Sequence, residues 1–148
     1  MFDARPCKPE GTPWLTPYLT VPDPGTAVEF YKNAFGFEVR LQVAHPDGGV
    51  EHAEVAYNGA VIMLGPESEE HTARAPMTTG TPSPVGLYLY TERLLDRYEQ
   101  AIAAGAETIS EPSVMFWGDR VFVVADPWGY KWTFAQNVAD YDPQVGAR

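Results

Sequence analysis

The amino-acid sequence predicts an α+β fold in which two βαβββ modules form curled half-barrel sheets, with the helices outside. Residues 16–39 read as a strand, a capped helix, a glycine stop and another strand, and residues 85–109 repeat this order. The spacing between the copies is almost constant, because Gly36 and Gly105 lie 69 positions apart and two glycines in later turns lie 70 apart. A spacing held across a helix and a later turn indicates an internal duplication.

The first strand of each unit alternates in polarity, so its side chains fall on two distinct faces. In the first copy, at residues 15–21, one face is apolar and the other is polar and aromatic. We expect the apolar faces to pack on the helices and the opposite faces to line whatever the sheets enclose. The apolar faces carry Leu19, Val21, Leu87 and Leu89, and the opposite faces carry Tyr18, Tyr88 and Tyr90.

Each unit contains one amphipathic helix. The first is expected to begin after Asp23, a favoured N-cap residue, with Pro24 at the first helical position, and to end at Gly36. Thr91 is the corresponding candidate cap of the second helix. The apolar stripes are Ala27, Phe30, Tyr31 and Ala34 in the first helix, and Leu94, Leu95, Tyr98, Ala101 and Ile102 in the second.

The remaining segments divide the chain into two modules joined by a linker. Further strands are expected at residues 37–44, 50–57 and 60–64, and then near residue 108 and at 120–124 and 130–135. The linker lacks a hydrophobic period and is rich in Pro, Gly and Thr. The expected divisions are an irregular N-terminal arm at residues 1–14, a domain at 15–136 with modules at 15–64 and 85–136 and the linker at 65–84, and a C-terminal tail at 137–148.

Composition and charge restrict the class of protein. The chain has 148 residues, enough for one domain with a packed core, and 20 acidic against 10 basic residues give a net charge of −10. This charge argues against nucleic acid and anionic membranes as partners. Cys7 is the only cysteine, which fits a reducing compartment, and no apolar run approaches the roughly 20 residues that span a bilayer. We therefore expect a cytoplasmic protein.

Four segments resemble a known family: TPYLTV at residues 16–21, HAEVAYNGAVIML at 52–64, FWGDR at 116–120 and DPWGYKW at 126–132. They are similar to the vicinal oxygen chelate superfamily, which contains glyoxalase I, bleomycin resistance proteins and extradiol dioxygenases, and within it to the glyoxalase-like, or PhnB-like, branch. The resemblance covers residues 14–136. It implies two modules whose sheets each curl into half a cup, usually with a homodimer completing the binding cavities.

The same resemblance bears on metal binding. Metal-dependent members hold a divalent ion on the inner face of the cup with four ligands, mostly His and Glu. Alignment by the shared motifs places these four positions at Thr16, Met63, Val85 or Gly86, and Thr133. A thioether and two hydroxyls do not offset the dehydration of a divalent ion. We therefore expect no metal and no cofactor, and no metal electrophile to stabilise an enediolate or activate dioxygen.

His52 and Glu54 are the candidate catalytic residues. They lie two positions apart on a predicted strand and therefore face the same way. Glu54 could orient His52 as a general base, or both could bind a polar group of a ligand. The alternative is a polar pair with no chemical role, across strands or at a sheet edge. His45 and His71 lie in predicted loops whose positions the sequence does not fix.

Tyrosines supply further candidate ligand contacts. Tyr18, Tyr88 and Tyr90 could stack on a flat ligand and hydrogen-bond its edge. Equally, they could pack between the modules or across a dimer. Met63 and Thr133, at two of the aligned inner-face positions, belong to the same predicted ligand-binding set.

The FWGDR segment offers two interpretations. Trp117 could close the mouth of a pocket, with Arg120 or Asp119 recognising a charged ligand. Alternatively, the segment is a loop locked by an ion pair between the adjacent acid and base. Trp128 and Trp132, in the last turn and strand, are expected in the core or in an interface.

These residues favour three functions, in the following order. The first is a metal-independent small-molecule-binding protein of the glyoxalase/bleomycin-resistance type, a homodimer that sequesters a toxic or aromatic compound. Its negative charge would steer cationic ligands toward it. The second is a glyoxalase-like lyase or isomerase in which Glu54 and His52 transfer a proton, with or without a divalent metal. The third is an assembly module whose cup is filled by Trp and Tyr side chains at a dimer interface.

Overall fold

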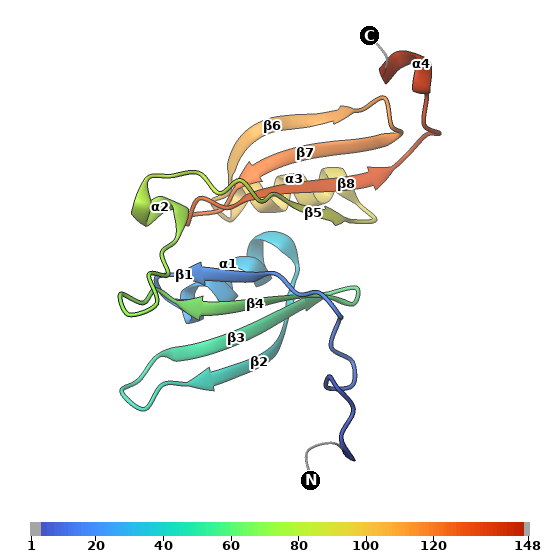
Figure 1. The fold of residues 1–148 in the computed structure, drawn as a ribbon. Coiled ribbons are helices and arrows are strands. Elements are labelled where there is room, and N and C mark those ends of the chain that lie inside the picture. Colours follow the sequence, from blue (N-terminus) through green and yellow to red (C-terminus); the bar gives the residue numbers. More distant parts are fainter. Residues whose placement is uncertain (1–3, 147–148) are drawn as a thin grey trace.

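The computed structural model describes residues 4–146 and contains two four-stranded mixed sheets, each with its own helix (Figure 1). The first sheet has the order β1-β4-β3-β2 and comprises β1 (Tyr18–Val21), β2 (Glu38–Ala44), β3 (Val50–Tyr57) and β4 (Ala60–Pro66), with helix α1 (Pro24–Phe35). The second has the order β5-β8-β7-β6 and comprises β5 (Leu87–Tyr90), β6 (Glu107–Val114), β7 (Asp119–Ala125) and β8 (Lys131–Asn137), with helix α3 (Leu94–Ala103). The α+β class and the two βαβββ modules are confirmed.

The two modules share one topology and one register. β1 pairs in parallel with β4, and β5 pairs in parallel with β8, while the other pairings are antiparallel. Tyr18 lies opposite Met63 in the first sheet, and Tyr88 lies opposite Thr133 in the second. Both partners of one pair are 70 positions from those of the other. The duplication inferred from the sequence therefore extends to individual strand pairs.

Helix α1 is specified locally, as expected. The Asp23 side chain accepts a hydrogen bond from the backbone N–H of Gly25 at 3.0 Å, and Gly36 ends the helix with φ of 74°. The buried face of α1 packs on the first sheet and also against aromatic rings of β8. Leu19 and Val21 are buried, and Leu87 and Leu89 pack against the same core. The apolar strand faces thus meet the helices as predicted.

Three local expectations are wrong. β1 begins at Tyr18 rather than at residue 15, because Pro17 lacks the N–H that strand pairing needs, and Leu15 is 88% exposed. Thr91 does not cap α3. The first backbone N–H of that helix, at Leu94, donates to Gln136 Oε1 at 3.2 Å, while the Thr91 hydroxyl contacts the Tyr57 hydroxyl at 3.1 Å.

The apolar stripe of α3 is also narrower than its sequence indicates. Leu94 and Ala101 are buried and Tyr98 packs on the core, but Leu95 and Ile102 are exposed. The two exposed residues lie seven positions apart, on one flank of the helix, outside its contact with the sheet.

The Asp126 carboxylate joins the two modules. It is 3% exposed and accepts four hydrogen bonds. Its Oδ2 atom accepts from the Tyr31 hydroxyl of α1 at 2.7 Å and from Trp132 Nε1 of β8 at 3.0 Å. Its Oδ1 atom accepts from the backbone N–H groups of Trp128 and Tyr130, each at 3.0 Å. One side chain thus fixes the β7–β8 turn and ties it to the helix of the other module.

Burial raises the pKa of Asp126, and the hydrogen bonds from Tyr31, Trp132 and the turn offset this only in part. The neighbouring carboxylate and burial together hold the pKa of Tyr31 well above its ordinary value, with burial the larger cause. Trp132 is 1% exposed and Trp128 is buried, so both tryptophans belong to the core of a single chain.

Further contacts reinforce this junction. The Tyr130 hydroxyl donates to the backbone carbonyl of Thr20 at 2.7 Å and accepts from its N–H at 3.1 Å, which attaches the β7–β8 turn to the edge of β1. On the opposite side, Gln100 Nε2 of α3 donates to the carbonyl of Asn33 in α1 at 2.7 Å. The modules therefore meet through their helix-covered faces, and the two other sheet faces remain open.

The segment between the modules is more ordered than its composition indicates. It contains a short helix, α2 (Pro76–Thr79), and an isolated bridge between Ser68 and Ala73. The N–H of Met77 donates to the carbonyl of Trp128 at 3.0 Å, so the segment packs on the β7–β8 turn. Within residues 4–146, no helix is both long and apolar enough to cross a membrane.

Replacing Asp126 with Ala should lower the free energy of unfolding by about 2–4 kcal/mol, because buried donors of Tyr31 and the turn lose their acceptor. Urea denaturation followed by tryptophan fluorescence measures this loss. Asp140→Ala removes an exposed carboxylate and is the matched control, with an expected change within about 0.5 kcal/mol. Equal stabilities for the two variants would contradict the role assigned to Asp126.

Candidate functional site

The candidate site is divided between the two sheet faces that no helix covers. We call the face that carries Tyr18, His52, Glu54 and Met63 the first open face. We call the face that carries Tyr88, Tyr90, Asp119 and Thr133 the second open face. The large rings on these faces are accessible, with exposed fractions of 56% for Tyr18, 48% for Tyr88 and 56% for Tyr90. None of these three tyrosines is buried between the modules of a single chain.

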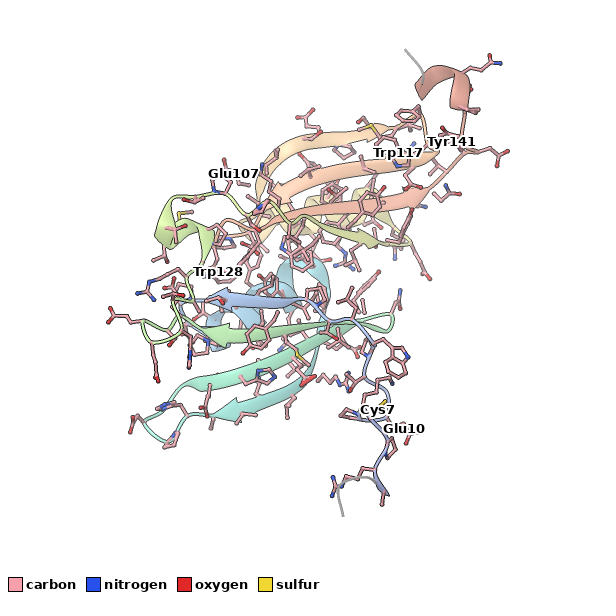
Figure 2. The ribbon with its side chains drawn as sticks, viewed as in Figure 1. Cys7, Glu10, Glu107, Trp117, Trp128 and Tyr141 are labelled. Carbon is pink, nitrogen blue, oxygen red and sulfur yellow. The ribbon has the colours of Figure 1, made fainter. Side chains whose placement is uncertain are left out.

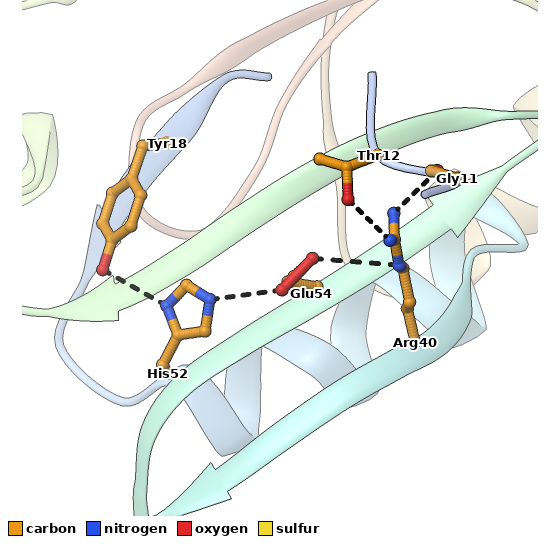
Figure 3. A network of polar contacts seen from close by, with 6 residues as sticks. All are labelled: Gly11, Thr12, Tyr18, Arg40, His52 and Glu54. Atoms are coloured by element: carbon orange, nitrogen blue, oxygen red, sulfur yellow. Dashed lines mark hydrogen bonds and ion pairs between the residues drawn. The ribbon is translucent and has the colours of Figure 1, made fainter. Parts of the chain in front are cut away.

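The first open face contains a chain of polar contacts (Figure 3). His52 and Glu54 alternate with the buried Ala53 and Val55 on β3, so they project on the side away from α1. His52 Nε2 lies 3.5 Å from Glu54 Oε2, and His52 Nδ1 lies 3.5 Å from the Tyr18 hydroxyl. Because β3 is an interior strand, the pair does not lie at a sheet edge.

Arg40 extends this chain to the N-terminal arm. Its Nε atom lies 3.9 Å from Glu54 Oε1, which places a positive charge beside the carboxylate. The other guanidinium nitrogens donate to the carbonyl of Gly11 at 3.3 Å and to Thr12 Oγ1 at 3.0 Å. The arm that the sequence predicts to be irregular is therefore held against the first sheet, and the charge of Glu54 is balanced locally.

A cavity of about 530 Å³ lies next to His52. Tyr18 and His52 line it from the sheet, and Ser68 and His71 line it from the segment that follows β4. The position of His71 was beyond the reach of sequence analysis, because the turn that returns it to the sheet depends on the Ser68–Ala73 bridge. A second, mostly apolar cavity of about 300 Å³ lies between the modules, lined in part by Phe37, Leu87 and Trp132.

The second open face is organised around Asp119, which is 2% exposed. Its Oδ2 atom accepts hydrogen bonds from the Tyr88 hydroxyl at 2.7 Å and the Tyr90 hydroxyl at 2.8 Å. Its Oδ1 atom accepts from Asn137 Nδ2 at 3.0 Å, and Trp117 Nε1 donates to the Tyr88 hydroxyl at 3.1 Å. Both tyrosines are therefore fixed from behind while their rings remain accessible.

The prediction of an ion pair within FWGDR is wrong. Asp119 binds neutral donors, and Arg120, as its neighbour on a strand, projects from the opposite face of β7. Arg120 pairs across the sheet with Gln136, whose side chain caps α3, which confirms that this is the helix-covered side. The FWGDR segment therefore forms a turn and the beginning of β7, with the Asp119 and Trp117 side chains on one side of the sheet and the Arg120 side chain on the other.

A tight turn positions Trp117 and Asp119. Gly118 adopts φ of 97°, and an added Cβ there would overlap the backbone carbonyl of Ala139. That segment pairs back onto the turn, since Val138 and Ala139 both donate their N–H groups to the carbonyl of Gly118. Figure 2 labels Trp117 and Tyr141 at the same end of the second sheet, where the chain leaves β8, and the Tyr141 ring lies 6.1 Å from the Phe116 ring. The residues after β8 thus form part of the support of the second open face.

Asp119 and the two tyrosines perturb one another's ionisation. Burial opposes the charge on Asp119, but hydrogen bonds from Tyr88, Asn137, Tyr90 and Trp117 outweigh it and lower the pKa of the carboxyl. Burial and the bond to Asp119 raise the pKa of Tyr88 to about 12. The same bond is the main cause of a raised pKa at Tyr90. At neutral pH the cluster is therefore an ionised carboxylate with two protonated phenols.

The structure thus groups the sequence-predicted site residues on two surfaces. Three of them have a partner that the sequence analysis did not identify. Glu54 lies beside Arg40, His52 shares its cavity with His71, and Asp119 accepts a hydrogen bond from Asn137. The strand alternation in FWGDR was the one available signal, since it separates Asp119 from Arg120.

The positions aligned with metal ligands do not fit a divalent ion. Met63 and Thr133 lie on the open faces, and Thr16 precedes β1, with its buried Oγ1 atom lacking a hydrogen-bond partner within the described chain. A single hydroxyl does not make a cation site. Among residues 4–146, no three His, Cys, Asp or Glu side chains are grouped so that they could hold a metal ion.

Comparison with known proteins identifies the family. A family model described as the Glyoxalase/Bleomycin resistance protein/Dioxygenase superfamily matches residues 13–134. The chain belongs to this superfamily. An uncharacterised protein of Mycobacterium tuberculosis is 33% identical to it over 130 residues, covering 86% of this chain and 76% of the relative. An uncharacterised protein of Mycobacterium bovis has the same identity over the same length, covering 86% of each.

Solved structures of the superfamily share the fold. TioX from Micromonospora has a TM-score of 0.67 and 22% identity, covering 84% of this chain and 98% of its own. A bleomycin resistance determinant encoded on transposon Tn5 has a TM-score of 0.61 and 22% identity, covering 85% of this chain and 98% of its own. The resemblance inferred from the sequence is confirmed for the superfamily, and the PhnB-like branch stays a prediction.

We expect the Tyr88 phenol to titrate with a pKa of about 12 and Asp119→Asn to lower this pKa. The reason is that a negative carboxylate opposes formation of the neighbouring phenolate, and the neutral amide removes this repulsion. NMR of the tyrosine Cζ carbons during alkaline titration gives the pKa directly. An unchanged Tyr88 titration in Asp119→Asn would show that the carboxylate does not control this phenol.

Proposed function

We propose that this protein is a metal-independent binding protein for a small organic molecule, held between open sheet faces in a homodimer. The observation that carries the proposal is the state of the three tyrosines. Tyr18, Tyr88 and Tyr90 are about half exposed. Each lies on a strand, and each hydroxyl forms a hydrogen bond with a side chain of another strand in the same sheet, either His52 or Asp119. Preorganised rings that face solvent favour stacking on a flat ligand, because little side-chain entropy is lost on binding.

The homodimer is supported by surfaces that one chain leaves uncovered. The edge strand β2 is exposed along its whole length, and Val39, Leu41 and Val43 are among its exposed apolar residues. On β6, Ile109 and Val114 are exposed as well. Unpaired apolar edges of this kind are commonly covered in native proteins. Pairing of two chains would also turn each open face into one wall of an enclosed cup.

A cytoplasmic location and sequestration of a toxic or aromatic compound are part of the same proposal. The single Cys7 fits a reducing compartment. One protein with which the chain shares its fold is described as a bleomycin resistance determinant. A protein that only binds needs no electrophile, which agrees with the donor set at Thr16, Met63 and Thr133.

Isothermal titration against a panel of flat aromatic compounds tests the binding function. We expect at least one member to bind, and Tyr18→Ala or Tyr88→Ala to weaken its affinity by about tenfold through loss of ring contacts. Leu95→Ala, an equally exposed apolar residue on α3, is the matched control and should leave the affinity unchanged. Binding that is the same in both tyrosine variants and in the control would place the ligand elsewhere.

A second candidate function, a glyoxalase-like lyase or isomerase, is favoured by the geometry around His52. A carboxylate 3.5 Å from one ring nitrogen and a phenol 3.5 Å from the other suit proton transfer by the imidazole. Glu54 would orient the ring, as the acidic partner does in other His-based sites. The Arg40 guanidinium, 3.9 Å from Glu54 Oε1, would balance the charge of this carboxylate.

The adduct of a thiol with an α-oxoaldehyde is the substrate that tests the second candidate. Conversion above the uncatalysed rate, with a loss of about 100-fold in both Glu54→Gln and His52→Ala, would support it. Elemental analysis of protein purified without chelators provides an independent measurement. One equivalent of a divalent transition metal per chain would contradict the metal-independent binding function, and wild-type protein without turnover would remove the lyase candidate.

A further inference from the structure

The second open face contains a buried negative charge without a positive partner. Asp119 is 2% exposed, and within residues 4–146 no Lys, Arg or His nitrogen lies within 4.0 Å of its carboxylate. Its hydrogen bonds come from two phenols and an amide, all of them neutral. Buried carboxylates in proteins are usually paired with a cation. The second open face therefore carries a buried carboxylate that forms no ion pair within the described chain.

The first open face differs in this respect. Its carboxylate, on Glu54, lies 3.9 Å from the Arg40 guanidinium and 3.5 Å from His52 Nε2. The two modules have the same strand order, so the contrast arises from side chains and not from topology. Lys131 does not compensate Asp119, because it lies at the opposite end of β8 from Asn137, about 20 Å away at the usual rise of a strand.

The hydrogen bonds around Asp119 also decide what the surface offers to a ligand. The Tyr88 and Tyr90 hydroxyl hydrogens point to the carboxylate, and the Trp117 indole N–H points to Tyr88. The donors of this cluster are thus already used. What remains toward solvent is phenolic oxygen lone pairs and aromatic ring faces, and the rings of Tyr88 and Tyr90 lie 5.5 Å apart at 61°. Both kinds of group attract positive charge.

We propose that the surface formed by Tyr88, Tyr90 and Trp117 over Asp119 recognises a cationic nitrogen of the ligand, as an alkylammonium or quaternary ammonium group. The cation would contact the ring faces and phenolic oxygens, and the carboxylate behind them would supply the compensating charge at short range. This inference rests on the proposed binding function and adds to it the chemical class of one ligand group and the half of the cup that binds it.

A matched pair of probes tests this inference on the full chain. Choline carries a quaternary nitrogen, and 3,3-dimethylbutan-1-ol has the same shape with a neutral carbon in its place. We expect wild-type protein to bind choline at least tenfold more tightly than the alcohol. The binding of each probe is measured by tryptophan fluorescence and by NMR shifts of the Tyr88 and Tyr90 rings. Equal affinity for the two probes in wild-type protein overturns the inference, whatever the variants do.

Three variants separate the local charge from other effects. Asp119→Asn should abolish the preference for choline, whereas Asp140→Asn removes an exposed charge near the same turn and should preserve it. Tyr90→Phe keeps both the ring and the carboxylate and should retain the preference within about threefold. This variant tests the same surface independently of whether Asp119→Asn folds. A preference that survives in well-folded Asp119→Asn, or that falls equally in Asp140→Asn, overturns the inference.

The outcome also distinguishes this inference from the proposed function. If flat aromatic compounds bind but cationic and neutral isosteres bind alike, the binding function stands and the cation site does not. If neither the aromatic panel nor the matched pair binds, both fall.

Discussion

The architecture depends on one buried carboxylate. Asp126 satisfies two backbone N–H groups of its own turn and, through its other oxygen, binds Tyr31 of α1 and Trp132 of β8. A local turn motif thereby also links the two modules, together with the Tyr130–Thr20 and Gln100–Asn33 hydrogen bonds. Because this junction lies between the helix-covered faces, it decides which faces of the two sheets stay open. The position of every candidate site residue follows from that choice.

The duplicated modules have diverged in chemistry while keeping their backbone plan. The paired positions Tyr18 and Tyr88 keep the same residue type, whereas the polar groups that hold them differ. One tyrosine contacts an imidazole in a charge-balanced chain, and the other donates to an isolated carboxylate. A duplicated sheet therefore gives two unlike walls. An asymmetric ligand, with one flat and one charged end, suits such a pair.

In both walls, the side chains that could touch a ligand are held in place by contacts with neighbouring side chains. Asn137 holds Asp119, which holds two phenols, and the close packing of Gly118 on the segment after β8 fixes the turn between them. Arg40 plays the equivalent part beside Glu54 and also holds the N-terminal arm. Rings fixed in this way bind without first being ordered, which favours recognition over conformational change.

The sequence by itself determined the duplicated βαβββ plan, the caps of α1, the apolar strand faces and the superfamily. These features depend on residues near one another in the chain or on their period, and such signals are local. Only the tertiary structure decided that Asp119 serves Tyr88 and Tyr90 and not Arg120, that His71 returns to His52, and that Thr91 contacts Tyr57 instead of capping α3. Those contacts join residues that lie roughly 20 to 35 positions apart in the chain. They depend on how whole modules pack, which no local sequence pattern encodes.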